Sequence, residues 1–488
     1  MSEELQTKLN NALKGQDYST ALTHCEALLN AGSSQPYILA IKGWCLYKSG
    51  QLKDAEPLLV EAFNQDPSQH FVATMVMSFY MEQGDYQQVV ALGQLCVGLH
   101  ANDRLMWHRL GTAHFMQADC VGAVAAFRRS LAVEYSKLTA FALSQPLLCQ
   151  GQYEEGLELY EHRFDAYPKL NWLQCEKMPM PQWQGEPLAG KSLLVWSEQG
   201  LGDSIQFSRM ITVLAQQGAT VDLMLSKDHS GLAELLNTVA GVSEVNVIHN
   251  QQVTLTRRYD YHSPLMSLMK GIQLTPSTIP ELTFPYISLP TLPKGVKACD
   301  RNPELYERLP TTESTKIKVG IVWTTALPER LQQQDNLHFM LKERKSLGTA
   351  DVLPVLQLEG FHFFCLHVVK SPAVEQVLGN HDVVDMSIHI QDFTDTATII
   401  EAMDLIISVD TSVAHLAGAL NKPVMNLLPF AADWRWQNNR EDTPWYPSMR
   451  LLRQTFFDDW STVSERLQQY LPEIRQRYQA TGEIQVFL

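Results

Sequence analysis

The sequence lacks the features that suit a protein to nucleic acids or membranes. Its 53 acidic side chains outnumber 38 basic ones, giving a net charge of −15, whereas phosphate backbones are bound by basic surfaces. It has no apolar run of about 18 residues, and its N-terminus has neither the basic nor the apolar region of a signal peptide. We therefore predict a cytoplasmic protein with no membrane span and no nucleic-acid partner.

Several common binding motifs are also missing. The eight cysteines form no Cys-x-x-Cys pair and no His-flanked cluster, so neither a zinc site nor a disulfide framework is indicated. The chain has no Gly-x-Gly-x-x-Gly dinucleotide loop and no Gly-Lys-Ser/Thr phosphate loop. At 488 residues it is nevertheless long enough for two to four domains.

What the sequence does contain is a repeat with a period of 34 over residues 1–172. Small residues and Asp-Tyr turn pairs return at this spacing, as helix-turn-helix units need where their helices cross; examples are Ala21, Ala55 and Ala123, Gly43 and Gly111, Asp17-Tyr18 and Asp85-Tyr86. The pattern resembles about five tetratricopeptide repeats, the fifth irregular. Such arrays form a superhelix whose concave face holds a peptide or protein; the alternative is that so short an array only buttresses the next domain.

A connector rich in proline and glycine, 173–190, leads to a predicted strand and a glycine loop. Gly200 and Gly202 permit a tight turn and close approach of the backbone to a ligand, and a helix should run from there to about residue 217. Asp203 lies where this helix begins. It is either an N-cap accepting hydrogen bonds from residues 205 and 206 or a general base at the mouth of a crevice.

His262 and Ser263 end another predicted strand and would line the same edge of this sheet. His262 is therefore a second candidate acid or base, with a structural hydrogen bond as the alternative. Prolines over 275–295 predict an extended crossing. The predicted domains after the connector are a first lobe, 191–295, and a second lobe with a C-terminal helix, 296–488.

The second lobe contains the most informative stretch. The apolar run Leu405–Val409 predicts a buried strand, which stops at good helix N-cap residues, Asp410, Thr411 and Ser412. A small-residue helix and a second apolar run, Val424–Leu428, complete a strand-helix-strand unit. The free backbone N–H groups at the start of the helix would attract phosphate; the alternative is a purely structural crossover.

Two further features accompany this unit. His415, in the first helical turn, could reach a diphosphate or ribose, or could be a core histidine bonded to backbone. The loop 324–346 holds cations, Arg330, Lys342, Arg344 and Lys345, which could neutralise a diphosphate or simply be solvated. Two tandem strand-helix sheets imply two Rossmann-like lobes, with ligands between them at the carboxyl ends of the strands.

Four motifs carry a family resemblance: Gln-Gly-Leu-Gly-Asp-Ser-Ile-Gln-Phe at 199–207, Val-Gly-Ile-Val-Trp at 319–323, Ser-Val-Asp-Thr-Ser-Val-Ala-His-Leu-Ala-Gly-Ala-Leu at 408–420 and Asp-Trp-Arg-Trp at 433–436. With the repeats, they resemble the bacterial tetratricopeptide-repeat glycosyltransferases. Their catalytic part is similar to heptosyltransferases of the GT-B fold, and their layout to protein O-GlcNAc transferase. The resemblance implies an all-α superhelix followed by a GT-B module of two Rossmann-like lobes.

The resemblance also implies roles for residues. Asp203 matches the family's proposed base, and the implied donor-binding residues are Gly200, Gly202, Gln206, Trp323, Lys345, Asp410, Thr411, Ser412 and His415. Lys345 stands where the family usually has arginine, so it keeps the charge but not the two-pronged hydrogen bonding.

The implied reaction is inverting transfer of a sugar from a nucleotide-sugar donor to a hydroxyl, without a divalent metal or other cofactor. Similar proteins act on Ser or Thr of flagellin, sometimes with a CMP-activated nonulosonic acid, and the repeats imply a protein acceptor. Two alternatives remain: a non-catalytic adaptor or chaperone with a degenerate GT-B module, and heptosyltransferase-like transfer to a glycolipid such as lipopolysaccharide.

Overall fold

The structure is a computed structural model of the 488-residue chain. It describes residues 2–33, 35–174, 177–248, 255, 257–279, 283–291, 298–310, 315–325, 345–368 and 370–487. The chain divides into two compact units, Met1–Pro146 and Leu147–Leu488, which are treated separately below.

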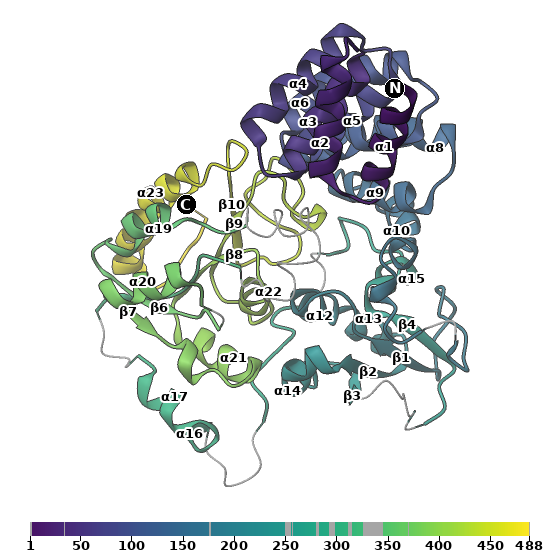
Figure 1. Ribbon diagram of the computed structural model, residues 1–488. Helices are drawn as coiled ribbons and strands as arrows, with labels where there is room; N and C mark the ends of the chain where they lie inside the picture. Colours follow the sequence, from purple (N-terminus) through teal and green to yellow (C-terminus); the bar gives the residue numbers. More distant parts are fainter. Residues whose placement is uncertain are drawn as a thin grey trace. The chain divides into compact units, whose positions relative to one another are not determined.

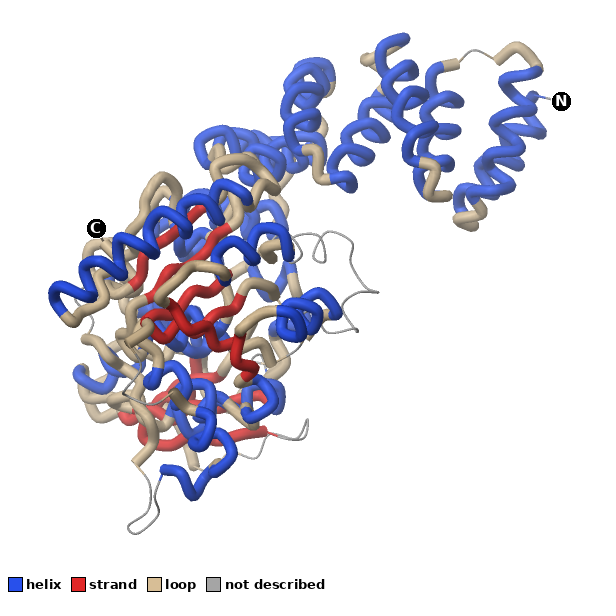
Figure 2. The backbone as a smooth tube through the Cα atoms, turned by 90° about the vertical axis from the view of Figure 1, so that its left-hand side faces the viewer, coloured by secondary structure: helices blue, strands red, loops and turns tan. Residues whose placement is uncertain are grey.

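The first unit is built from antiparallel helix pairs (Figure 1). Its helices are α1 (Ser2–Lys14), α2 (Tyr18–Asn30), α3 (Pro36–Lys48), α4 (Leu52–Gln65), α5 (His70–Gln83), α6 (Tyr86–Leu99), α7 (Arg104–Met116), α8 (Cys120–Val133) and most of α9 (Lys137–Cys149). Figure 2 shows strands only in the second unit among the described residues. The predicted helical repeat array is confirmed.

The repeat positions explain how each pair forms. A Cβ atom on Gly43 would lie 2.8 Å from Leu59 Cγ, and one on Gly111 would lie 2.7 Å from Phe127 Cδ1. In these two pairs, only glycine therefore allows the second helix to approach this closely. The turn aspartates act as N-caps: Asp17, for example, accepts a hydrogen bond of 3.0 Å from Thr20 N.

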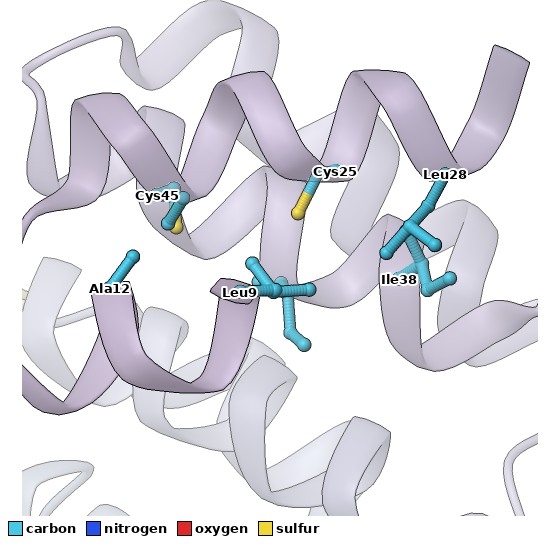
Figure 3. Packing of buried hydrophobic residues seen from close by; sticks show 8 residues of the cluster. Leu9, Ala12, Cys25, Leu28, Ile38 and Cys45 are labelled. Carbon is cyan, nitrogen blue, oxygen red and sulfur yellow. The ribbon is translucent and has the colours of Figure 1, made fainter. Parts of the chain in front are cut away.

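The core of the first helices is made of small and medium apolar side chains (Figure 3). Leu9, Cys25, Leu28 and Cys45 are almost fully buried there. Burial raises the pKa of the Cys25 thiol to about 12 and that of Cys45 to about 11. These thiols are therefore packing groups rather than reactive ones.

The second unit begins with helices that follow directly on the repeats: the end of α9, then α10 (Tyr153–Tyr160), α11 (Arg163–Ala166) and the 3-10 turn η1 (Pro168–Leu170). The predicted boundaries at 172 and 190 thus lie inside this unit. They remain a prediction of domain organisation.

A four-stranded parallel sheet follows, in the order β3-β2-β1-β4. Its strands are β1 (Ser192–Trp196), β2 (Thr220–Ser226), β3 (Val242–Ile248) and β4 (Tyr261–Pro264). The helical segments here are α12 (Leu201–Phe207), α13 (Met210–Gln216), η3 (Lys227–Leu232), α14 (Ala233–Leu236), η4 (Leu265–Ser267) and α15 (Leu268–Gly271). The helix predicted to run unbroken to about residue 217 is therefore two helices, separated at Ser208 and Arg209.

The second sheet has six parallel strands in the order β10-β9-β8-β5-β6-β7. They are β5 (Ile317–Val322), β6 (Phe361–Cys365), β7 (Val383–Asp385), β8 (Leu405–Val409), β9 (Val424–Leu428) and β10 (Met449–Arg453). Around it lie α16 (Ala298–Arg301), α17 (Pro303–Arg308), α19 (Thr349–Leu356), α20 (Pro372–Asn380), η7 (Ser387–His389), α21 (Phe393–Ala402), α22 (Ser412–Ala419), η8 (Trp434–Trp436) and α23 (Ser461–Thr481).

The two sheets confirm the predicted fold class, helical repeats followed by parallel α/β lobes. The strand-helix-strand unit β8-α22-β9 has the predicted strand bounds. Strand β10 was not predicted. None of the helices in the described parts of the chain is long and apolar enough to cross a membrane.

Candidate active site

The turn from β8 into α22 places Asp410 and Thr411 at the carboxyl end of the second sheet. All of β8 is buried, and the strand stops at Val409. Thr411 is the N-cap residue of α22, but its side chain makes no capping hydrogen bond. Its Oγ1 instead lies 3.0 Å from Ser408 Oγ. The first turn of α22 therefore keeps N–H groups that its cap residue does not satisfy.

Asp410 is held as an anion beside this helix start. Lys345 Nζ donates a hydrogen bond of 2.8 Å to Asp410 Oδ2, and His415 Nε2 lies 3.7 Å from Asp410 Oδ1. Burial alone would raise the pKa of Asp410, but the Lys345 ammonium holds it well below its usual range. The carboxylate and the ammonium together form a partly exposed ion pair.

His415 is a buried histidine whose partners are side chains. Its Nδ1 lies 3.0 Å from Tyr446 Oη, and its ring stacks on Trp436 with centroids 5.4 Å apart. Burial, followed by the nearby Arg435 charge, lowers the pKa of His415 to about 4. The ring is therefore neutral near pH 7, and its hydrogen-bond partner is a tyrosine rather than the backbone.

The glycine loop between β1 and α12 is capped by a side chain of the first helical turn. Gly200 is the N-cap residue, and Asp203 Oδ2 accepts a hydrogen bond of 2.8 Å from Gly200 N. The alternative in which Asp203 itself is the N-cap of residues 205 and 206 is wrong, because Asp203 is the third residue of the helix.

Gly202 is the point at which α12 meets α22. A Cβ atom at Gly202 would lie 2.6 Å from His415 Cδ2, closer than packed side chains allow. The close approach predicted for the glycine loop is therefore made, but to the histidine of the other lobe. The helix starts that were expected to face each other across a crevice pack together here.

Arg435 joins the two lobes at the same place. Its Nη2 donates 2.6 Å to Asp203 Oδ1, its Nη1 donates 2.7 Å to Gln206 Oε1, and its Nε donates 2.8 Å to Asp433 Oδ1. Burial would lower the pKa of Arg435, but the carboxylates of Asp433 and Asp203 raise it well above its usual value. Arg435 is 6% exposed and Gln206 is fully buried. Gln206 therefore holds Arg435 and does not itself face solvent.

The predicted site residues thus fall into a buried floor and a partly exposed rim. The floor consists of two predicted residues, His415 and Gln206, together with Arg435, for which the sequence predicted no role. The rim consists of partly exposed groups at both helix starts; these are Gly202, Asp203, Lys345, Asp410, Thr411 and Ser412. A ligand would meet the rim, because Arg435, His415 and Gln206 are buried.

Trp323 lies at the end of β5 with its ring 1% exposed. Its backbone N donates 3.1 Å to His367 Nε2, and its carbonyl accepts 2.8 Å from Leu347 N. Trp323 therefore anchors the chain just after Lys345. The other predicted cations of this loop, Arg330, Lys342 and Arg344, lie outside the described residues.

His262 is the predicted site residue that the structure does not bring to this cluster. It lies in β4 opposite Leu194, with its backbone bonded to Pro181 and Trp183. Its ring is 2% exposed, and its Nδ1 has no hydrogen-bond partner within the described part of the chain. Among the described residues, no hydrogen bond or ion pair joins His262 to Asp203. Its role as acid or base remains a prediction.

The residue that the sequence reasoning missed is Arg435. The Asp-Trp-Arg-Trp motif at 433–436 served as part of the family resemblance, and no role was predicted for its arginine. The signal was an arginine between two tryptophans in an acidic chain, since a cation in so apolar a setting needs carboxylate partners.

The chain combines a helical array with two parallel-sheet lobes whose helix starts meet at the carboxyl ends of the strands. This is the arrangement expected of a repeat-containing glycosyltransferase. Residues 391–449, which run from the start of α21 to the start of β10, match glycosyltransferase family 9 (heptosyltransferase). Protein FlbA of Caulobacter vibrioides is 25% identical over 376 residues, which is 73% of this chain and 58% of that protein. The predicted resemblance to repeat-containing glycosyltransferases is therefore confirmed.

Solved structures of helical-repeat proteins are also similar to part of the chain. MamA from Desulfovibrio magneticus is 11% identical, with 34% of this chain and 96% of that chain covered and a TM-score of 0.31. A thermophilic TPR protein from Thermus thermophilus is 17% identical, with 35% and 93% covered and a TM-score of 0.29.

Proposed function

We propose that the chain is a glycosyltransferase that moves a sugar from a nucleotide-sugar donor to a Ser or Thr hydroxyl of a protein acceptor. The observation that carries the proposal is the packing of the start of α12 against α22: Gly202 lies against His415, and Arg435 bonds Asp203 while its charge helps to lower the pKa of Asp410. The family 9 match supports it, since residues 391–449 include the whole β8-α22 turn and Arg435. The resemblance further suggests flagellin as acceptor and a CMP-activated nonulosonic acid as donor.

The donor's phosphate would bind at the start of α22. The N–H groups of the first turn and the helix dipole favour an anion there. Lys345 would add a full positive charge; it now pairs with Asp410, 2.8 Å away, and can turn towards a phosphate because it is partly exposed. Such groups stabilise the departing phosphate without a metal. Among the described residues, no group of three or more His, Cys, Asp or Glu side chains could hold a metal ion.

Asp203 would serve as the base. The acceptor oxygen attacks the anomeric carbon, its proton passes to the carboxylate, and the carbon–oxygen bond to phosphate breaks with its electron pair leaving on phosphate. Attack from the face opposite the phosphate inverts the anomeric carbon. Arg435 and Gly200 each hold one oxygen of Asp203, which fixes the carboxylate on the rim. The helical repeats would recruit the acceptor through their concave face.

A non-catalytic adaptor is a second candidate, favoured by one observation. Both oxygens of Asp203 already accept hydrogen bonds, one from Arg435 and one from Gly200. On this alternative, Asp203 and Arg435 serve only to fasten the lobes together.

Intact-mass analysis of candidate acceptors co-expressed with the chain separates the two. The wild-type chain should add a sugar mass to an acceptor, and Asp203→Asn, which keeps the size of the side chain, should abolish the addition while still binding acceptor. An acceptor modified equally by both chains rules out Asp203 as the base. An acceptor that binds but is never modified supports the adaptor.

A further inference from the structure

The glycine loop before α12 is bonded to the segment that follows the repeats, which includes α10 and α11. Three successive loop residues are each bonded to residues between 160 and 172. Trp172 Nε1 donates 2.6 Å to the carbonyl of Ser197, Arg163 pairs with Glu198, and Gln199 Nε2 donates 2.8 Å to Tyr160 Oη. The loop that presents Asp203 therefore has little freedom of its own.

The Arg163–Glu198 pair is completely buried, with 0% exposure of both side chains. Arg163 Nε and Nη2 donate to the two oxygens of Glu198 at 2.7 and 2.8 Å. The remaining N–H groups reach Tyr160 O, Glu161 Oε1 and Ser267 Oγ at 3.3, 2.8 and 2.7 Å. All five donors of the guanidinium are thus used, which fixes α11 against the loop.

Tyr160 touches both halves of the candidate site. Its hydroxyl accepts from Gln199, the residue immediately before the N-cap Gly200, and also lies 3.6 Å from Met266 Sδ. Its ring meets Trp434, next to Arg435, edge to face with centroids 6.2 Å apart. Gln199 has φ of 59°, a left-handed conformation that a non-glycine residue adopts only when its surroundings hold it.

We propose that Tyr160 is a positioning residue, which holds the glycine loop against the 433–436 turn so that Asp203 and Arg435 meet. The hydroxyl fixes the loop, and the ring fixes the turn. The effect of Tyr160 on sugar transfer rests on the proposed function. Its effect on the order of the glycine loop does not. The last helices of the array would thus be part of the catalytic module.

Tyr153 supplies a matched control. It also meets Trp434 edge to face, with centroids 6.0 Å apart, but its buried hydroxyl has no hydrogen-bond partner in the described part of the chain. Tyr160→Phe and Tyr153→Phe therefore each remove one buried hydroxyl near the same tryptophan, and only the first breaks a bond to the loop.

Hydrogen–deuterium exchange of the full-length chain tests the structural claim. Peptides covering 197–207 should exchange about fivefold faster in Tyr160→Phe, as expected for the loss of one hydrogen bond, and at the wild-type rate in Tyr153→Phe. Gln199→Met, which removes the other end of the bond and keeps the Tyr160 ring, should reproduce the effect. Equal exchange in the two phenylalanine variants, or an unchanged rate in Gln199→Met, overturns the proposal.

Transfer kinetics test the positioning role. With a nucleotide-sugar and an acceptor, kcat should fall about tenfold in Tyr160→Phe, as when a reacting group is slightly misplaced, while KM for the donor stays within about twofold. A rise in donor KM with unchanged kcat contradicts the role assigned to Tyr160. If the wild-type chain transfers no sugar, the proposed function fails, and the exchange experiment still decides whether Tyr160 holds the loop.

Discussion

Both strand-to-helix turns of the candidate site carry an aspartate near the helix start, but they differ in how the helix start is satisfied. At α12, Asp203 lies in the first turn, bonds back to Gly200 N and pairs with Arg435. At α22, the cap residue Thr411 makes no side-chain capping bond, and its neighbour Asp410 is occupied by Lys345. The first helix start already holds an anion, whereas the second is open to one. An anionic leaving group therefore belongs at α22, and the carboxylate chemistry belongs at α12.

Among the variants that test this difference, Arg435→Met should have the largest effect on the free energy of unfolding, because it removes the cation that Asp203 shares with Asp433. Breaking a buried ion pair from one side costs about 3–5 kcal/mol. Urea unfolding measures it, and Arg440→Met is a suitable control, since Arg440 pairs with Asp442, which is 62% exposed. A loss no greater than that of the control would show that Arg435 is not what fastens the α12 side.

The pH dependence of stability tests the α22 side. The pKa of His415 is lowered from 6.5 to about 4 in the folded chain, so the unfolded chain takes up the proton first as the pH falls. Stability is lost between pH 6.5 and about 4, and at pH 5 the loss amounts to about 2 kcal/mol. Urea unfolding at pH 7 and pH 5 should show a loss that is about 2 kcal/mol larger in the wild type than in His415→Gln. The other histidines contribute to both chains and cancel in the comparison.

Lys345→Met should weaken nucleotide binding about tenfold, corresponding to about 1.4 kcal/mol, because it removes the cation of the open helix start. Asp203→Asn should leave binding within about twofold. Isothermal titration with a nucleoside monophosphate and a nucleoside diphosphate measures both. If both variants weaken nucleotide binding equally, the two helix starts do not differ in their affinity for the anion.

Thr411→Val should have the smallest effect on stability. Losing an N-cap hydrogen bond costs about 1 kcal/mol, but the Thr411 side chain makes no such bond. A loss of a few tenths of a kcal/mol is expected in urea unfolding. Ser371→Ala is the matched case, since Ser371 Oγ accepts from Val374 N and caps α20. If both substitutions cost the same, Thr411 caps α22 after all.

The features that the sequence predicted well are local ones. The helix pairs, β8, α22 and β9 follow from residues close together in the chain: an apolar run, a cap residue, a small-residue helix. The misses depend on distant partners. Arg435 and Asp203 are 232 positions apart, and the residues around each of them do not predict that they pair. Strand β10 was missed because Arg450 interrupts its apolar pattern; that arginine is buried with Glu441 as its partner.

The end of the repeat array was difficult for the same reason. Its period predicts more helices of the same kind, but α10 and α11 belong to the second unit. What places them there is Arg163, whose partner Glu198 lies 35 positions away in the glycine loop. A repeat pattern predicts contacts between neighbouring repeats, but it does not predict where the last repeat packs.

The most direct test is to follow the backbone amides of both helix starts by NMR while a nucleoside diphosphate is added to the full-length chain. The account predicts that the amide signals of residues 411–414 shift on binding, whereas those of residues 201–203 move little. Large shifts at 201–203 with none at 411–414 would contradict it.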